Sequence, residues 1–228
     1  MNLLIIGDPH AHPDYDNSRF TALGKFIAKE RPEVIVCIGD MADMPSLSSY
    51  DKGTKGFEGR RYKKDVKAVI DAQEKLFAPI KKVRGYKPKL HMCLGNHEDR
   101  ITRAVNTTPE LEGAIGIEDL KYKEFGWKVT PFKKCVTIKG ITFSHYFSSG
   151  VMGRPISSVH IGYALITKLH CSAVQGHSHY TTTLNKQSQT VKIYLVWLLA
   201  ASHTLSTQKR GVRTLSTSGG EALSCLMD

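Results

Sequence analysis

Short apolar runs separated by amphipathic stretches constrain the fold of this chain more than any other feature. Residues 3–6, 34–38 and 90–94 are rich in leucine and β-branched residues, and a glycine follows each run. Between these runs, over residues 18–31 and 62–77, apolar positions recur at helical spacing, and Ser18 is the expected N-cap of the first helix. Strands that alternate with helices in this way predict a parallel sheet with crossover helices.

The second half of the chain has a different pattern. Residues 135–138 and 141–144 flank a Lys-Gly pair, which predicts a β-hairpin. We expect a helix over residues 158–169, a strand over 171–175, and two short strands near 181–184 and 191–194. The stretch 44–61 is rich in serine, glycine and basic residues, and we expect it to be a mobile loop.

Composition and charge restrict the class of protein. The 228 residues are 41% hydrophobic and 23% charged, which is typical of one globular domain with a core of its own. The N-terminus lacks a basic leader, and no apolar run reaches the roughly 18 residues that span a bilayer, so we expect neither a signal peptide nor membrane insertion. The five cysteines form no C-x-x-C pair, which favours a reducing, cytoplasmic compartment. The net charge of +11 attracts polyanions such as nucleic acid, but it equally fits a lysine-rich surface.

Each strong apolar run ends in side chains that bind metal ions in other proteins. In chain order these residues are Asp8, His10, Asp40, Asp43, Asn96, His97, His145, His177 and His179. Because the carboxyl ends of strands line the ligand crevice of open α/β sheets, we expect these turns to converge. A set of carboxylate, imidazole and amide groups suits Mn²⁺, Fe, Zn²⁺ or Ni²⁺, whereas Mg²⁺ and Ca²⁺ prefer oxygen ligands alone. The glycines that precede four of these turns are expected to permit their tight backbone.

The motifs D-x-H, G-D-x-x-D, G-N-H-E, H and G-H-x-H occur in this order between Asp8 and His179. Together they are similar to the motifs of the calcineurin-like metallophosphoesterase superfamily, and the chain resembles its phage-type members. The resemblance implies an α/β fold, namely an αββα sandwich of two mixed β-sheets flanked by helices. It also implies two divalent metal ions at the sheet edge, for which we expect manganese, with iron, zinc or nickel as alternatives.

The resemblance further implies a role for each motif residue. One metal ion would be held by Asp8, His10 and His179. The other would be held by Asn96, His145 and His177. Asp40 would bridge both ions, and a bridging hydroxide would attack a phosphoester in line. His97 would then act as general acid or hydrogen-bond donor at the leaving oxygen, with Asp43 holding it in orientation.

Departures from the family pattern bear on the substrate. The protein Ser/Thr phosphatase branch carries arginine at two places that here hold Met44 and Cys93-Leu94, so we do not expect protein phosphatase activity. Arg100, just after G-N-H-E, and Arg154, after His145, are the candidate substrate-binding residues. With further basic residues in the loop 44–61, they favour a phosphodiester substrate such as nucleic acid or a nucleotide. No aromatic-interleaved motif supports nucleic-acid binding.

Two other functions stay open at this point. One is a phosphomonoesterase that acts on nucleotides or small molecules, and the other is a catalytically silent metal-binding scaffold. Retention of His97 and of every ligand position argues against the scaffold. The sequence does not indicate the oligomeric state.

The last part of the chain does not fit the pattern. We expect the catalytic domain over residues 1–194 and an atypical tail over 195–228, since apolar positions in residues 202–218 recur with no convincing helical or strand period. With suitable codons, a shift of one nucleotide over residues 196–221 gives a segment similar to the closing segment of phage-type members. We therefore hypothesise that the tail arises from a frameshift.

Overall fold

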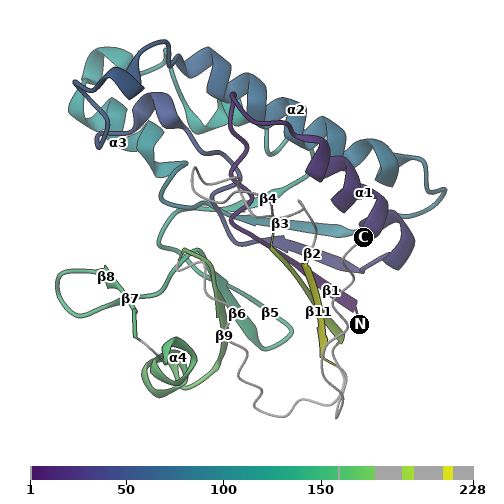
Figure 1. Ribbon diagram of the computed structural model, residues 1–228. Coiled ribbons are helices and arrows are strands. Elements are labelled where there is room, and N and C mark those ends of the chain that lie inside the picture. Colours follow the sequence, from purple (N-terminus) through teal and green to yellow (C-terminus); the bar gives the residue numbers. More distant parts are fainter. Residues whose placement is uncertain (1, 159, 178–191, 198–212, 218–228) are drawn as a thin grey trace.

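The computed structural model describes residues 2–158, 160–177, 192–197 and 213–217. These residues form four layers: two helices, a large sheet, a small sheet and a further helix (Figure 1). This αββα arrangement confirms the predicted fold class. The large sheet has the strand order β11-β10-β1-β2-β3-β4. Its strands are β1 (Asn2–Gly7), β2 (Val34–Cys37), β3 (Lys89–Cys93), β4 (Lys128–Thr130), β10 (Lys192–Trp197) and β11 (Arg213–Thr217).

The large sheet is parallel except for β11, which runs antiparallel to β10. Helices α1 (Ser18–Glu30) and α2 (Tyr62–Lys81) connect β1 to β2 and β2 to β3, and both cover the same face of the sheet (Figure 1). The predicted parallel sheet with crossover helices is therefore confirmed. The order of the strands changes direction at β1, which has β2 on one side and β10 on the other. Such a switch point is the usual place of a ligand crevice.

Burial on both faces explains why β1 reads as an unbroken apolar run. Leu4 and Ile6 face the helices and join the larger core, whereas Leu3 and Ile5 face the small sheet. A strand covered on both sides has no solvent-facing positions, so apolar and polar residues do not alternate along it.

The small sheet consists of β5 (Val136–Ile138), β6 (Ile141–Ser144) and β9 (Ser172–Gln175), in the order β5-β6-β9. β5 and β6 form the predicted antiparallel hairpin, and β9 runs parallel to β6. Fully buried Phe143 fills the space between the two sheets. On the outer side, α4 (Ile161–Leu169) packs through Leu165 against Phe147 and Ile156. A two-stranded hairpin, β7 (Ser148–Ser149) and β8 (Arg154–Pro155), projects beside α4 (Figure 1).

The remaining elements are short. They are α3 (Asp99–Thr107) and the 3₁₀ turns Pro45–Leu47, Lys55–Phe57, Pro109–Leu111 and Ile117–Leu120. The loop 44–61 therefore contains two turns of its own. Its predicted mobility stays a prediction. β4 was not predicted, because it has three residues and no apolar run.

Three predicted helix limits were wrong. The N-cap of α1 is Asn17 rather than Ser18, and its side chain donates to Ala68 on α2 instead of capping the helix. Helix α2 continues to Lys81, because apolar residues beyond position 77 still face the core. Helix α4 begins at Ile161 rather than at residue 158, where the Ser158 hydroxyl accepts a hydrogen bond from the His160 N–H and so forms a turn before the helix.

The end of the chain is described only in part. β10 overlaps the strand predicted at 191–194 and crosses the predicted boundary at residue 194, and β11 lies beyond it. The strand predicted at 181–184 and most of the tail lie outside the described residues, so the frameshift stays a hypothesis. No helix within the described residues is long and apolar enough to cross a membrane. The four cysteines of this part, Cys37, Cys93, Cys135 and Cys171, are free thiols.

Candidate metal centre

The turns after the parallel strands converge at one edge of the large sheet, as predicted, and their backbone is unusual. Asp8, His10, Asp40 and His177 all have positive φ angles, of 32°, 45°, 50° and 67°. Residues other than glycine seldom adopt this conformation, and such outliers cluster at functional sites. The backbone N–H of His10 donates to the carbonyl of Asp40 at 2.8 Å, which joins the first turn to the second. The convergence thus rests on backbone bonds between turns.

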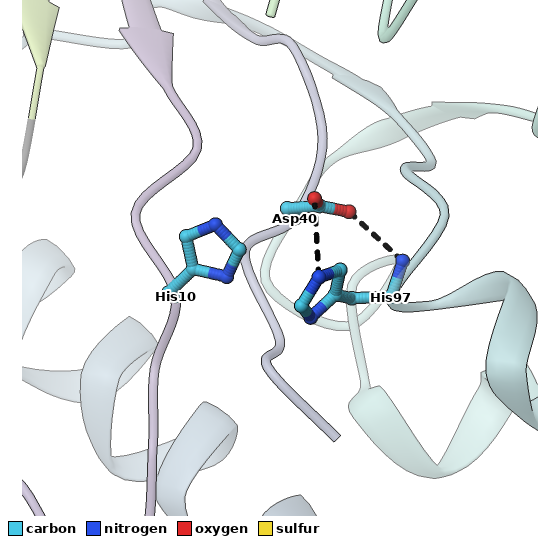
Figure 2. A group of neighbouring side chains, drawn as sticks. All are labelled: His10, Asp40 and His97. Atoms are coloured by element: carbon cyan, nitrogen blue, oxygen red, sulfur yellow. Dashed lines mark hydrogen bonds and ion pairs between the residues drawn. The ribbon is translucent and has the colours of Figure 1, made fainter. Parts of the chain in front are cut away.

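Asp40 lies at the centre of the converging side chains. His10, Asp40 and His97 offer ligand atoms that all lie within 4.8 Å of one another (Figure 2). The backbone N–H of His97 donates to Asp40 Oδ1 at 2.9 Å, and His97 Nε2 lies 3.8 Å from Asp40 Oδ2. Asp40 is therefore positioned by the same turn that supplies His97.

A second group of ligand atoms lies on the other side of Asp40. Nε2 of His145 lies 2.8 Å from Asn96 Oδ1 and 3.4 Å from Asp40 Oδ2. Nδ1 of His177 lies 2.8 Å from the same Asn96 oxygen. His145 Nδ1 donates to the carbonyl of Ile38 at 2.9 Å, which leaves the lone pair of Nε2 directed at Asn96 and Asp40. Asp40 thus contacts both groups of candidate ligands.

Asp8 joins the first turn to the last motif. Its Oδ2 accepts a hydrogen bond from the backbone N–H of His177 at 2.6 Å, and its Oδ1 lies 3.7 Å from His145 Nδ1. His179, the remaining candidate ligand, lies outside the described residues.

The electrostatics of the centre suit divalent cations. Burial raises the pKa of Asp8 to about 7, and burial together with the charges of Glu98 and Asp8 raises the pKa of Asp40 well above its usual range. Burial also lowers the pKa of His145 to about 3, which keeps its imidazole in the neutral form that binds metals. Buried carboxylates beside neutral imidazoles gain from a bound cation, so the residues present fit the metal ions that the motifs imply.

Glu98 organises the two central turns, a role that the sequence left undetermined. Its fully buried carboxylate accepts hydrogen bonds from the backbone N–H groups of Asp40, Ala42 and Gly95, at 3.0, 2.9 and 2.8 Å. A fourth comes from the hydroxyl of Tyr122 at 2.9 Å. Glu98 therefore ties the turn that carries Asp40 to the turn that carries Asn96 and His97.

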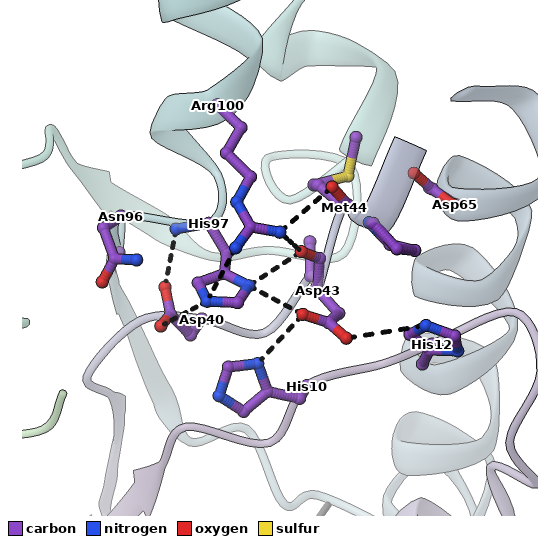
Figure 3. A network of polar contacts seen from close by, with 12 residues as sticks. His10, His12, Asp40, Asp43, Met44, Asp65, Asn96, His97 and Arg100 are labelled. Carbon is purple, nitrogen blue, oxygen red and sulfur yellow. Dashed lines mark hydrogen bonds and ion pairs between the residues drawn. The ribbon is translucent and has the colours of Figure 1, made fainter. Parts of the chain in front are cut away.

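Asp43 contacts His97 as the predicted orientation requires. Asp43 Oδ1 lies 2.7 Å from His97 Nδ1, which also lies 2.8 Å from the Asp43 carbonyl (Figure 3). Burial alone would raise the pKa of Asp43, but hydrogen bonds from His10 and His97 hold it well below its usual range. His12 is a further neighbour that the motifs did not indicate: its Nε2 lies 3.8 Å from Asp43 Oδ2.

The two candidate substrate-binding arginines have different surroundings. One guanidinium nitrogen of Arg100 donates to the carbonyls of Asp43 and Met44, at 2.8 and 3.2 Å. Its other terminal nitrogen lies 3.3 Å from His97 Nε2, so Arg100 adjoins the centre (Figure 3). Arg154 is exposed on β8, and within the described residues no hydrogen bond or ion pair joins it to the centre. Substrate binding by either residue stays a prediction.

Close approach of a neighbouring carboxylate explains two of the turn glycines better than turn geometry does. A Cβ atom at Gly95 would collide with the carboxylate of Asp40, and one at Gly176 would collide with that of Asp8. Neither glycine has a positive φ angle, whereas Gly39 does, at 106°. The predicted role in tight turns therefore applies to Gly39, while Gly95 and Gly176 make room for the carboxylates of Asp40 and Asp8.

Comparison with known proteins agrees with this geometry. The model of the calcineurin-like phosphoesterase family matches residues 1–218. The chain belongs to this family. It is therefore a phosphoesterase of a family that binds divalent metal ions. The chain is also similar to the Gene 54 protein of Mycobacterium phage D29, with 27% identity over 183 residues that cover 78% of this chain and 68% of the relative. The Gene 54 protein of Mycobacterium phage L5 is 26% identical over 183 residues, which again cover 78% of this chain and 68% of the relative. These relatives agree with the predicted phage-type resemblance.

Proposed function

We propose that this phosphoesterase hydrolyses phosphodiester bonds at a centre of two divalent metal ions, with manganese as the preferred metal. The observation that carries the proposal is the place of Asp40 between two groups of ligand atoms. Asp40 lies beside His10 on one side and 3.4 Å from His145 on the other. One carboxylate shared in this way suits a pair of cations better than a single one.

Each metal ion would be held by ligands from different turns. The first would be held by Asp8, His10 and His179, with Asp40 shared. The second would be held by Asn96, His145 and His177. When bound, the two cations supply positive charge to the phosphoryl oxygens and make water a stronger nucleophile near neutral pH.

His97 would transfer a proton at the leaving oxygen. Its Nδ1 contacts the carboxylate of Asp43, so its Nε2 would face Asp40 and the substrate. With the ring held in this orientation by Asp43, Nε2 would donate a proton to the leaving oxygen. Arg100, 3.3 Å from the same nitrogen, would add positive charge where negative charge develops.

A diester substrate is favoured by the charge of the chain. The net charge of +11 and the basic loop after Asp43 attract an extended polyanion. A small phosphomonoester would not need such a surface.

The test is hydrolysis by metal-free protein to which Mn²⁺ is added back. The substrates are bis(p-nitrophenyl) phosphate and p-nitrophenyl phosphate, and the variants are Asp40→Ala and His97→Ala. We expect diester cleavage, lost in Asp40→Ala with its bound metal and reduced about 10²- to 10⁴-fold in kcat in His97→Ala. The exposed residues Asp14 and His160, changed to alanine, are the matched controls. Cleavage of the monoester alone would contradict the diester assignment, and no turnover despite bound metal would contradict the enzyme itself.

A further inference from the structure

Tyr50 is an aromatic side chain presented to solvent beside the metal centre. It lies in the loop that follows Asp43, and 89% of its surface is exposed. Single exposed aromatics are common in proteins, so exposure alone assigns no role. The place of Tyr50 relative to the centre and to nearby charges is more informative.

The loop around Tyr50 is fixed at both ends. Near its start, the N–H of Ser46 donates to the carboxylate of Asp65 on α2 at 3.0 Å. Near its end, Arg60 forms an ion pair with Asp51 at 2.5 Å and donates to the carbonyl of Pro45 at 3.2 Å. These bonds close the loop on itself, so Tyr50 projects from a defined base.

The base of the loop adjoins Arg100. The turn Pro45–Leu47 packs against α3, which carries Arg100, and Arg100 donates to the carbonyl of Met44. Burial lowers the pKa of Arg100, and the carboxylates of Asp43 and Asp40 oppose this shift, with a smaller contribution from Tyr50. Arg100 in turn lies 3.3 Å from His97 Nε2, so the base of the loop that carries Tyr50 adjoins the proposed proton donor.

The charges beside Tyr50 suit a phosphate backbone. Lys52, Lys55 and Arg61 are exposed on the same loop. In the part of the chain that the structure describes, neither lysine forms an ion pair, so both charges are available to a ligand. An exposed aromatic side chain with lysines on the same loop is a combination that binds single-stranded nucleic acid, in which bases stack and phosphates pair with cations.

We propose that Tyr50 stacks on a base of single-stranded nucleic acid whose phosphates lie along Lys52 and Lys55, and thereby places the next phosphodiester at the metal centre. The inference rests on the proposed phosphodiesterase function and names its substrate class. One tyrosine in a basic loop is not a motif, so a stacking role for Tyr50 was not predictable from the sequence alone.

The test compares two oligomers of equal length and charge, a thymidine oligomer and one whose sugars carry no base. In the Mn²⁺-loaded enzyme, Tyr50→Ala should lower kcat/KM for the thymidine oligomer by about ten- to a hundred-fold and leave the base-free oligomer unchanged. Tyr50→Phe should restore the rate, since it keeps the aromatic face. Tyr163→Ala removes another exposed tyrosine, on α4, and should have no effect.

Binding is measured separately, by fluorescence anisotropy of the labelled oligomers with Mn²⁺-loaded protein that carries His97→Ala to slow cleavage. Tyr50→Ala should weaken binding of the thymidine oligomer alone, and Lys52→Gln with Lys55→Gln should lower the slope of log K against log salt by about 1.4, at about 0.7 per phosphate contact. Equal losses on both oligomers, or no loss, would overturn the proposal. A wild-type enzyme that cleaves bis(p-nitrophenyl) phosphate but neither oligomer would overturn the substrate class proposed here. One that cleaves none of the three would contradict the proposed function, while the binding comparison would still decide the role of Tyr50.

Discussion

Replacing Glu98 by glutamine tests whether this carboxylate holds the metal centre together. The two side chains have the same shape, but glutamine offers one oxygen instead of two. Glu98 Oε2 accepts hydrogen bonds from the backbone N–H groups of Asp40 and Gly95. Oε1 accepts from the N–H of Ala42 and from the Tyr122 hydroxyl. The amide group will therefore replace Oε1, because the Tyr122 hydroxyl is able to reverse its role and accept. The N–H of Ala42 then faces another donor and loses its partner.

The expected cost follows from these bonds. A buried donor left without a partner costs about 1–3 kcal/mol, and two bonds that change from a charged to a neutral acceptor weaken by about 1 kcal/mol each. Against this, loss of the negative charge relieves repulsion with Asp40, whose pKa Glu98 helps to raise. We expect a net loss of about 2–4 kcal/mol in the free energy of unfolding, which lowers Tm by about 4–16 °C for a chain of this size.

Urea unfolding of the metal-free protein measures this loss, and titration with Mn²⁺ measures the accompanying fall in metal affinity. Tyr122→Phe removes one of the four bonds and should cost about 1 kcal/mol. Glu124→Gln is the matched control, since Glu124 is exposed and pairs with Lys121 at 3.4 Å, and it should change stability by less than about 0.5 kcal/mol. A Glu98→Gln variant whose free energy of unfolding also changes by less than about 0.5 kcal/mol would refute the role assigned to Glu98.

Three further changes should have defined results. Removal of metal by EDTA should lower Tm, and Mn²⁺ at about a hundred times its Kd should restore about 2.7 kcal/mol for each bound ion, as followed by thermal melts; an unchanged Tm would argue against a metal centre. Gly95→Ala should abolish Mn²⁺ binding in calorimetry, because its methyl group collides with a ligand carboxylate, whereas Gly56→Ala should bind normally. Asp43→Asn should lower kcat by about 10²- to 10⁴-fold with metal content unchanged, because His97 loses its charged partner; an unaffected kcat would exclude that partnership. If the tail is frameshifted, the gene read one nucleotide earlier over codons 196–221 will encode a segment similar to the closing segment of phage-type members, and stop codons in that frame would disprove it.

The sequence predicted those features that depend on local pattern. The strands β1, β2 and β3 were found because each is a continuous apolar run, and the ligand turns were found because a glycine and a metal-binding residue follow each run. Their convergence followed from the parallel order of the strands. Asp8, Asp40 and His145 accordingly lie together, as expected.

Features that depend on contacts distant in the sequence were not predictable. The sequence left open whether Glu98 supports the metal ligands or caps a helix, and only the fold brings Ala42 and Tyr122 to its carboxylate. His12 has no motif of its own, and its approach to Asp43 depends on how two turns meet. The short strand β4 carries too few apolar residues to be recognised, and it pairs because β3 offers a free edge.

The pairing of β1 with β10 has a consequence for synthesis of the protein. Asn2 pairs with Lys192, so one edge of this buried strand has no partner until residue 192 has left the ribosome. At about 5–20 residues per second, this edge stays open on the order of ten seconds or more after β2 has emerged. During that time the nascent chain displays an apolar strand with unpaired backbone groups, which other strands can join. Yield in a cell will therefore depend on the speed of translation and on chaperones, even where the finished protein is stable.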